Sequence, residues 1–414
     1  MTTQHEDRHA SPEVARRPRG TLASVALIAV LVASGLGGCS QRTDSPSSSS
    51  TSSTATVPAL GASEWPAVPA QALPPEVASK LKAEVHGWVE KELLPGVTVA
   101  VVSPQGVWTA ADGVDGDGAP LQPNSGMALA SITKTFTAAE VLLLAERGLL
   151  DLDAPASTYV DQPALANGTT VRQLLAHRSS IAEGEEAAYA TMMSELDTPW
   201  STKQVLAPVP APTAAPGTRF SYVNANYILL GLVIEKVTGL DPAAAFARDL
   251  WQPLGLTRVA YQDQQTLAPP LARPGTDEEL PNGTPEGPYL PSRSMASVFG
   301  AAGGVASDAE STARWGYALY GSRLLTPDSV AQMTDFDDGD GYGLGTMDFS
   351  SGRFSHATLD AVGHLGVLPG YRTLLAVFPA SALSIAILTP STVDPSPYVK
   401  WLVAAGRLPT GRPQ

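Results

Sequence analysis

A serine and a lysine three residues apart, Ser131 and Lys134, stand at the start of a long apolar helical pattern, Ile132–Arg147. A helix start leaves backbone N–H groups unpaired and favours negative charge. Lys134 falls on the same helical face as Ser131, one turn away. A neutral lysine amine in that position can accept a proton from the serine hydroxyl. This spacing alone favours a nucleophile and an ordinary helix cap about equally.

A second pair with the same spacing, Ser79 and Lys82, shows how little the spacing proves by itself. Ser79 lies in the middle of another helical pattern, Val77–Leu94. We expect this pair to lie on the solvated face of its helix. Other motifs are therefore needed to distinguish Ser131 from Ser79.

Two such motifs follow along the chain. They are Tyr222-Val223-Asn224 and Gly363-His364-Leu365-Gly366, and each of the patterns Tyr-x-Asn and His-x-Gly occurs once in the sequence. Together with Ser-x-x-Lys, this order resembles the serine β-lactamase and penicillin-binding-protein superfamily. It looks closest to the branch of class C β-lactamases and D-Ala-D-Ala carboxypeptidases.

Shorter segments add to the resemblance, which covers about residues 73–408. In chain order they are Leu174–Ile181, Tyr227–Gly231 with Thr238-Gly239, Pro253–Leu256, Ala301–Val305 and Tyr342–Gly345. Their joint order is far more specific than any single motif. Ser180 departs from the pattern, because the family usually has glycine there. His177, in the first segment, is interpreted as a structural hydrogen-bonding histidine and not as a catalyst.

The resemblance implies an acyl-enzyme mechanism without cofactor or metal. Ser131 would attack a carbonyl group, Lys134 would assist its deprotonation, and Tyr222 would transfer protons. The backbone N–H groups of Ser131 and Val367 would form the oxyanion hole. We therefore take Ser131, Lys134 and Tyr222 as the candidate catalytic residues.

The resemblance also implies that Asn224, His364 and Gly366 belong to the substrate site, with Asn224 orienting Lys134 and the substrate. His364 stands where many relatives have lysine, and an unperturbed histidine titrates near pH 6.5. If neutral His364 is required, activity should fall below about that pH. Leu365 replaces a small hydroxyl residue that would contact a substrate carboxylate.

The substrate stays open at this stage. A D-amino-acid peptide, such as a cell-wall stem peptide, and a small ester or amide fit equally well, and a β-lactam is a third possibility. A different class of function is a non-catalytic protein that binds or senses cell-wall material on the same fold. The intact motifs argue against that alternative.

The chain order of helix, strands, helices, strands and helix predicts an α/β (α+β) fold with one antiparallel sheet built from both chain ends. Strand-like runs lie at Val97–Val102, Tyr371–Phe378 and Leu383–Leu388. We expect the domain to span residues 73–408, with a mostly helical lobe at about 130–291 and a tail at 409–414. Residues 267–291 are rich in proline, glycine and acids and should form a long loop.

The N-terminus has the pattern of a bacterial lipoprotein signal. An apolar run, Leu22–Leu36, follows three arginines and is shorter than the roughly 20 residues that span a bilayer. Two glycines, Gly37 and Gly38, separate it from Cys39, which is the only cysteine and the predicted lipidation site. The prediction is a signal peptide at 1–38, a Ser/Thr/Pro-rich tether at 39–72, and attachment to the outer face of the cell membrane.

The charge of the chain bears on its partners. A formal net charge of −14 argues against nucleic acid as a partner. Hydrophobic residues make up 43% of the chain, enough for a sizeable core. The expected partners are thus a small-molecule or peptide substrate and the membrane, while the oligomeric state is left open.

Overall fold

The structure is a computed structural model that describes residues 65–183, 198–262, 267, 270–275, 293–336, 339–355 and 359–410. Cys39, the predicted signal peptide, most of the predicted tether and most of the predicted loop 267–291 lie outside these residues. Within the described part of the chain, no helix is both long enough and apolar enough to cross a membrane.

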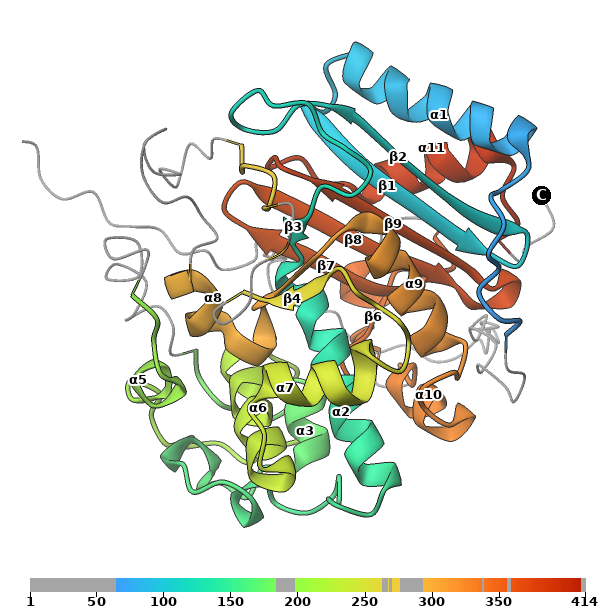
Figure 1. The fold of residues 1–414 in the computed structure, drawn as a ribbon. Coiled ribbons are helices and arrows are strands. Elements are labelled where there is room, and N and C mark those ends of the chain that lie inside the picture. The colour runs from blue at the N-terminus through green and yellow to red at the C-terminus, as the bar shows by residue number, and fades with distance from the viewer. Residues whose placement is uncertain are drawn as a thin grey trace, which may run out of the picture. The chain divides into compact units, whose positions relative to one another are not determined.

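A six-stranded antiparallel sheet has the order β2-β1-β9-β8-β7-β6 (Figure 1). Its strands are β1 (Gly96–Ser103), β2 (Gly106–Gly113), β6 (Met347–Asp348), β7 (Val362–Leu368), β8 (Tyr371–Phe378) and β9 (Leu383–Thr389). The first strand pairs with the last, with Thr98 opposite Leu388. The predicted sheet built from both chain ends is confirmed.

Helices cover both faces of this sheet. Helices α1 (Pro75–Glu90) and α11 (Ser396–Gly406) lie on one face, and α9 (Ala309–Tyr320) lies on the other (Figure 1). Side chains of β1 alternate between the two layers because successive strand residues point to opposite faces. Val99 packs in the core cluster with α1, while Ala100 packs in the larger cluster on the other side.

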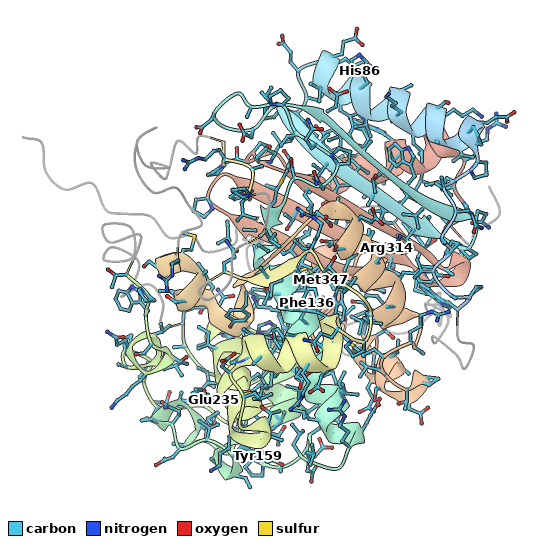
Figure 2. All side chains as sticks on the ribbon, in the orientation of Figure 1. His86, Phe136, Tyr159, Glu235, Arg314 and Met347 are labelled. Carbon is cyan, nitrogen blue, oxygen red and sulfur yellow. The ribbon has the colours of Figure 1, made fainter. Side chains whose placement is uncertain are left out.

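The middle of the chain is mostly helical, as predicted. Its helices are α2 (Thr133–Glu146), α3 (Val171–Leu175), α5 (Thr202–Leu206), α6 (Asn224–Thr238) and α7 (Pro242–Phe246), and α8 (Arg293–Phe299) and α10 (Pro327–Met333) follow. Helix α2 is buried along nearly its whole length, with Phe136 (Figure 2) stacked on Trp315 at 4.1 Å between ring centroids. Because the helix is buried on all sides, it has no solvated polar face, and its charged side chains Lys134 and Glu140 are buried as well.

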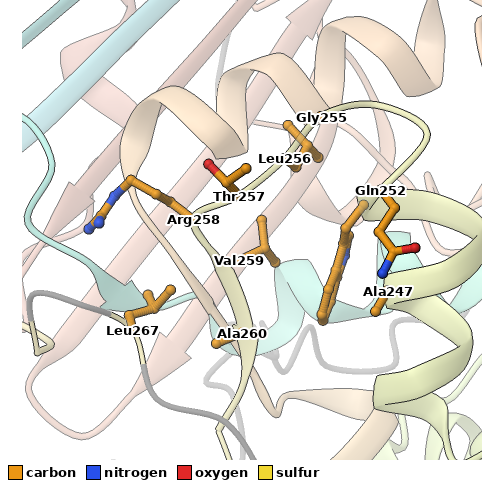
Figure 3. Close-up of a pocket in the computed structure, with 10 residues that line it drawn as sticks. Ala247, Gln252, Gly255, Leu256, Thr257, Arg258, Val259, Ala260 and Leu267 are labelled. Carbon is orange, nitrogen blue, oxygen red and sulfur yellow. The ribbon is translucent and has the colours of Figure 1, made fainter.

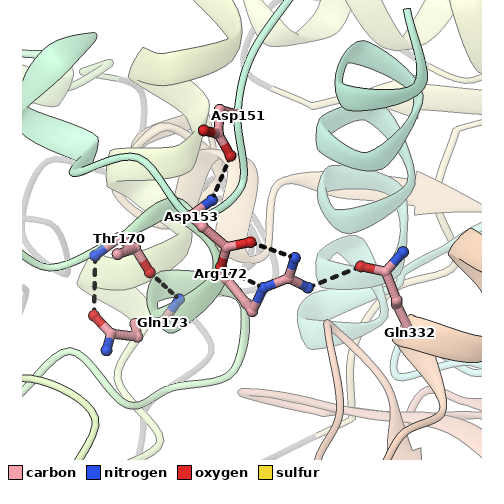
Figure 4. A network of polar contacts seen from close by, with 6 residues as sticks. All are labelled: Asp151, Asp153, Thr170, Arg172, Gln173 and Gln332. Atoms are coloured by element: carbon pink, nitrogen blue, oxygen red, sulfur yellow. Dashed lines mark hydrogen bonds and ion pairs between the residues drawn. The ribbon is translucent and has the colours of Figure 1, made fainter. Parts of the chain in front are cut away.

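The short helix α3 is held by polar contacts at its start (Figure 4). Thr170 and Gln173 form a capping box, in which each side chain accepts a bond from the other residue's backbone N–H. Arg172 binds Asp153 through two nitrogens, and it also donates to Gln332 of α10 at 2.9 Å. These contacts fix the position of the loop that follows α3.

A small second sheet, which the sequence patterns do not predict, lies beside the helices. It has three strands in the order β3 (Met127–Ala128), β5 (Val305–Ser307) and β4 (Val259–Tyr261). Its strands have only two or three residues each, too short for a period-2 pattern to appear in the sequence. It places the strand before Ser131 directly against residues 305–307.

The folded domain also begins earlier than the predicted start at residue 73. Trp65 is only 8% exposed and packs edge-to-face on Tyr317 at 5.0 Å. Arg323 donates to the Trp65 carbonyl, and Gln71 accepts the N–H of Val107 at 3.0 Å. The proline-rich composition suggested a tether, but residues 65–72 pack against the domain.

Candidate active site

Ser131 stands at a sharp backbone turn where a short 3₁₀ segment, Ala130–Ile132, leads into α2. The preceding residue, Ala130, has a φ of +50°, a left-handed conformation that is unfavourable for residues with a Cβ. The Ser131 side chain is partly exposed, whereas its neighbours in α2 are buried. The local strain therefore presents one hydroxyl at the buried start of a helix.

Lys134 is completely buried, and its ammonium group is surrounded by oxygen atoms. Its Nζ lies 3.0 Å from Ser131 Oγ, 2.7 Å from Asn224 Oδ1 and 2.9 Å from the Ala302 carbonyl oxygen. Two of these partners, the amide and carbonyl oxygens, can only accept hydrogen bonds. As an ammonium group Lys134 donates to all three oxygens, so it must release a proton before it can accept one from Ser131.

Asn224 is placed by the start of helix α6. Its backbone N–H donates to both carboxylate oxygens of Glu183, each at 3.1 Å. A carboxylate at a helix N-terminus satisfies an N–H group that has no partner within the helix. Glu183 thus binds the backbone of Asn224, the first residue of α6, and the Asn224 side chain contacts Lys134.

Tyr222 lies two residues before Asn224, with its ring beside the same lysine. The Lys134 Nζ is 4.9 Å from the centroid of the Tyr222 ring. The ring also packs near His177, at 4.3 Å between centroids, and near Tyr342, at 5.8 Å. The structure therefore brings together Ser131, Lys134, Tyr222 and Asn224, which are more than 90 positions apart at their extremes.

His364 is fully buried on β7 and does not behave as a histidine in water. Its Nε2 lies 3.1 Å from the Tyr342 hydroxyl, and its Nδ1 lies 2.6 Å from the Leu365 carbonyl oxygen. Burial first, and then the charge of Lys134, lowers the pKa of His364 to about 3. From its residue type His364 is expected to titrate near neutral pH, whereas burial of the ring lowers its pKa.

The strand β7 approaches Ser131 closely at Gly366. A Cβ at Gly366 would lie 2.1 Å from the Leu129 carbonyl oxygen, so only glycine fits there. Thr373 on β8 donates to the same carbonyl at 3.0 Å. This close contact brings β7 against the backbone of Leu129, two residues before Ser131.

The exposed side of β7 is apolar. Leu365 and Val367 are its two partly exposed residues, while the residues between and beside them are buried. Leu365 packs against the core cluster that also contacts Phe220 and Tyr222. The strand therefore exposes two branched apolar side chains, one of which, Leu365, replaces the small hydroxyl residue of the family pattern.

Ser79 and Lys82 serve as a natural contrast to this site. Both are exposed on α1, and Ser79 Oγ donates to the Pro75 carbonyl at 2.8 Å. The expectation of a solvated helix face is confirmed. Burial of the lysine, and not the spacing of the pair, distinguishes Lys134 from Lys82.

Three residues of the site were not predicted from the sequence: Ala302, Glu183 and Tyr342. Ala302 and Tyr342 lie in segments that carry the family resemblance, but no role was assigned to either. Ala302 acts through its backbone carbonyl, which leaves no signal in residue type. Glu183 acts on a helix 41 positions away in sequence, which no local pattern encodes.

A separate pocket of about 720 Å³ lies near β4 (Figure 3). Trp251, Leu256 and Val259 are among its apolar lining residues, and Arg258 also lines it. None of the candidate residues of the Ser131 site contributes to this lining. We assign it no role in the chemistry.

Comparison with solved structures gives the fold class. The D-amino acid amidase from Ochrobactrum anthropi SV3, in complex with L-phenylalanine, superposes with a TM-score of 0.68 at 21% identity. The match covers 80% of this chain and 98% of that one. The antiparallel sheet and its helices thus form a β-lactamase/transpeptidase-like fold.

The family follows from the sequence itself. The Beta-lactamase family model matches residues 81–406, more than three quarters of the chain, and the chain therefore belongs to the beta-lactamase family. This result confirms the resemblance drawn from the three motifs. The fold and the family model thus agree on the same superfamily.

Curated relatives differ in the activities that their names state. Esterase EstB from Burkholderia gladioli is 32% identical over 195 residues, which cover 40% of this chain and 49% of the esterase. Penicillin-binding protein 4 from Amycolatopsis lactamdurans is 28% identical over 327 residues, 72% of this chain and 81% of that protein. The chain spans about half the length of the matched esterase.

Proposed function

We propose that this protein is a serine hydrolase that works through an acyl-enzyme on Ser131. The observation that carries the proposal is the 3.0 Å contact between the Ser131 hydroxyl and the buried Lys134 amine. The Ser131 proton passes to neutral Lys134 as Oγ attacks the substrate carbonyl carbon. The leaving group then departs with a proton, which we assign to Tyr222 as the donor.

Water completes the cycle by attacking the acyl carbon and releasing the acid from Ser131. Negative charge on the carbonyl oxygen is stabilised in both steps by the N–H groups of Ser131 and Val367. Removal of one such donor typically raises the barrier by about 2.7–4 kcal/mol. The close approach of Gly366 to Leu129 supports this arrangement, because it brings β7 next to the Ser131 segment.

We propose that the substrates are D-amino-acid peptides or amides, or small esters and amides. Support comes from the esterase and the penicillin-binding protein among the relatives, and from the D-amino acid amidase among the similar folds. The neutral His364 and the apolar Leu365 and Val367 favour substrates with uncharged groups beside β7. A β-lactam ranks third because its carboxylate would lie beside the uncharged His364 and the apolar Leu365.

We further propose that the protein is secreted and lipid-anchored through Cys39. The proposal rests on the apolar run before Cys39 and on the Ser/Thr-rich segment after it. The mass of the processed N-terminus tests it, with a diacylglyceryl group on Cys39 as the expected result. An intact Met1, or an unmodified Cys39, would refute it.

A covalent probe tests the catalytic proposal directly. We expect a fluorescent fluorophosphonate or penicillin to label the wild-type protein and Ser79→Ala, and not to label Ser131→Ala. Ser79 is a matched control because it has the same spacing to a lysine but is exposed. Labelling that survives Ser131→Ala would refute the nucleophile.

Turnover then ranks the substrates. We expect hydrolysis of p-nitrophenyl esters or D-amino-acid amides to exceed that of a chromogenic cephalosporin. If neither probe labels the wild-type protein and no ester is hydrolysed, a non-catalytic protein that binds cell-wall material becomes the better interpretation.

A further inference from the structure

His177 holds the backbone on both sides of Tyr222. Its carbonyl oxygen accepts the N–H of Ser221 at 2.9 Å, and its ring Nδ1 accepts the N–H of Val223 at 3.1 Å. One residue thus binds the backbone N–H groups of the two residues on either side of the candidate proton carrier. His177 lies in the loop after α3, 45 positions before Tyr222.

The same ring also packs on the Tyr222 side chain. The centroids of the two rings are 4.3 Å apart, with an interplanar angle of 32°. Tyr342 closes the group from another direction, at 4.8 Å from His177 and 5.8 Å from Tyr222. Contacts with both the backbone and the ring leave Tyr222 little freedom next to Lys134, whose Nζ lies 4.9 Å from the Tyr222 ring.

The hydrogen bonds define the protonation state of His177. A backbone N–H can only donate, so Nδ1 carries no proton and the neutral ring has its hydrogen on Nε2. The amide nitrogen of Asn226 lies 3.1 Å from the same Nδ1. Burial first, and then the charges of Lys134 and His364, holds the pKa of His177 well below its ordinary value.

The backbone of His177 carries a cost that packing alone would not require. Its φ is +56°, in the left-handed region that glycine favours and that asparagine, aspartate and histidine adopt more often than other residues with a Cβ. Its Nε2 has no hydrogen-bond partner among the described residues although it is buried. An apolar ring would fill the same space without leaving a polar atom unsatisfied. Compared with an apolar ring, histidine adds the acceptor Nδ1, which binds the Val223 N–H.

We propose that His177 is a positioning residue of the Ser131 reaction, which sets the place of Tyr222 through the Val223 N–H and the ring contact. This inference rests on the proposed function, since Tyr222 must take part in proton transfer for its position to matter. His177 itself touches neither Ser131 nor the substrate in this scheme. It acts through the segment Ser221–Asn224.

Two substitutions separate the acceptor from the ring. His177→Asn keeps an oxygen at the position of Nδ1 and tolerates a positive φ, but it removes the ring. His177→Phe keeps a ring and removes the acceptor. The exposed His86 on α1 (Figure 2) provides the control variant His86→Asn. Each variant is first titrated with a fluorophosphonate, so that rates refer to labelled sites.

We expect His177→Phe to lower kcat for ester hydrolysis by about 100-fold with little change in KM, because a misplaced proton carrier slows chemistry without weakening binding. His177→Asn should retain activity within roughly tenfold of wild type, because only the ring contact is lost. Amide hydrogen exchange at Val223 should be faster in His177→Phe and near wild type in His177→Asn. If His177→Phe does not fold, His177→Gln is used in its place. The side-chain amide of glutamine lies at the position of Nε2, so this variant also lacks the acceptor at the position of Nδ1.

The outcomes are distinct. A His177→Phe protein with wild-type kcat per labelled site would overturn the inference, as would His177→Asn falling as low as His177→Phe. A loss that follows only the folded fraction, with normal kcat per labelled site, would also overturn it. A wild-type protein that is neither labelled nor active would instead refute the proposed function.

Discussion

The Tyr342 hydroxyl and Nε2 of His364 lie 3.1 Å apart in the buried layer beneath the candidate site. Because the Leu365 carbonyl oxygen can only accept, His364 Nδ1 carries the ring proton and donates to it. Nε2 therefore accepts the Tyr342 proton. Both ring nitrogens are used inside the protein, so His364 supports β7 and supplies no charge to a substrate near neutral pH.

The first prediction concerns pH. The pKa of His364, lowered to about 3, leaves the ring neutral from pH 4 upward, so it takes up no proton between pH 5 and 8. We expect His364→Asn to lower kcat/KM without moving any acid limb in that range. The pH profile of ester hydrolysis for both proteins is the measurement. An acid limb in wild type that vanishes in His364→Asn would show that His364 titrates there after all.

The second prediction concerns the close approach of β7 to Ser131. In Gly366→Ala the new Cβ would meet the Leu129 carbonyl oxygen at 2.1 Å, so the strand must shift away. We expect kcat to fall by about 10²–10³-fold, the usual result of losing an oxyanion donor.

Gly87→Ala is the matched control for that substitution. Gly87 lies inside α1, where a Cβ would meet nothing closer than the Lys91 Nζ at 3.8 Å. Alanine there should raise the free energy of unfolding by about 0.5–1 kcal/mol and leave kcat unchanged. Equal activities of the two variants would contradict the oxyanion assignment for β7.

Much of the fold could be predicted because strong periodic patterns carry it. The strands at 97–102, 371–378 and 383–388 are long, β-branched and bounded by turns, and they pair as expected. The strands β3, β4 and β5 were missed because tertiary pairing, and not local pattern, makes them extended. Trp65 was assigned to the tether because composition cannot show what a single aromatic side chain contacts.

The candidate site likewise contains residues that sequence motifs predict and residues that they do not. Ser131, Lys134 and Asn224 were found through motifs, and the structure brings their side chains together. The pKa of His364 could not be predicted, because it depends on burial and on a lysine 230 positions away in sequence. Ala302 and Glu183 were missed because they act through a backbone carbonyl and a helix end.

The third prediction tests where the domain begins. Trp65→Ala removes a buried ring that packs on Tyr317, and we expect the free energy of unfolding to fall by about 3 kcal/mol. Trp401, which is 44% exposed on α11, provides the control Trp401→Ala with a much smaller loss. Urea unfolding compares the two. Equal losses would place Trp65 in the tether after all.

The last prediction concerns a buried acid in α2. Glu140 has no exposed surface and lies near Asp249, which also binds Arg147 at 3.2 Å. Burial first, and then the negative charge of nearby Asp249, raises the pKa of Glu140 to about 8 from its ordinary 4.5, although Arg147 and Arg248 oppose the rise. Folded Glu140 is thus mostly protonated at pH 7, whereas unfolded Glu140 is ionised.

The sign of the pH effect follows from the protons bound in each state. Between pH 4.5 and about 8 the folded protein holds a proton that the unfolded chain releases, so the free energy of unfolding falls as pH rises, by up to roughly 1.4 kcal/mol per pH unit. Glu140→Gln cannot titrate, so its Tm should exceed that of wild type at pH 8 and lose this advantage near pH 5. Glu235→Gln, at an exposed position of α6 (Figure 2), should follow wild type throughout. The measurement is the Tm of the three proteins from pH 5 to 8.5. If the Tm of Glu140→Gln and the Tm of wild type change with pH in parallel, Glu140 is ionised in the folded protein.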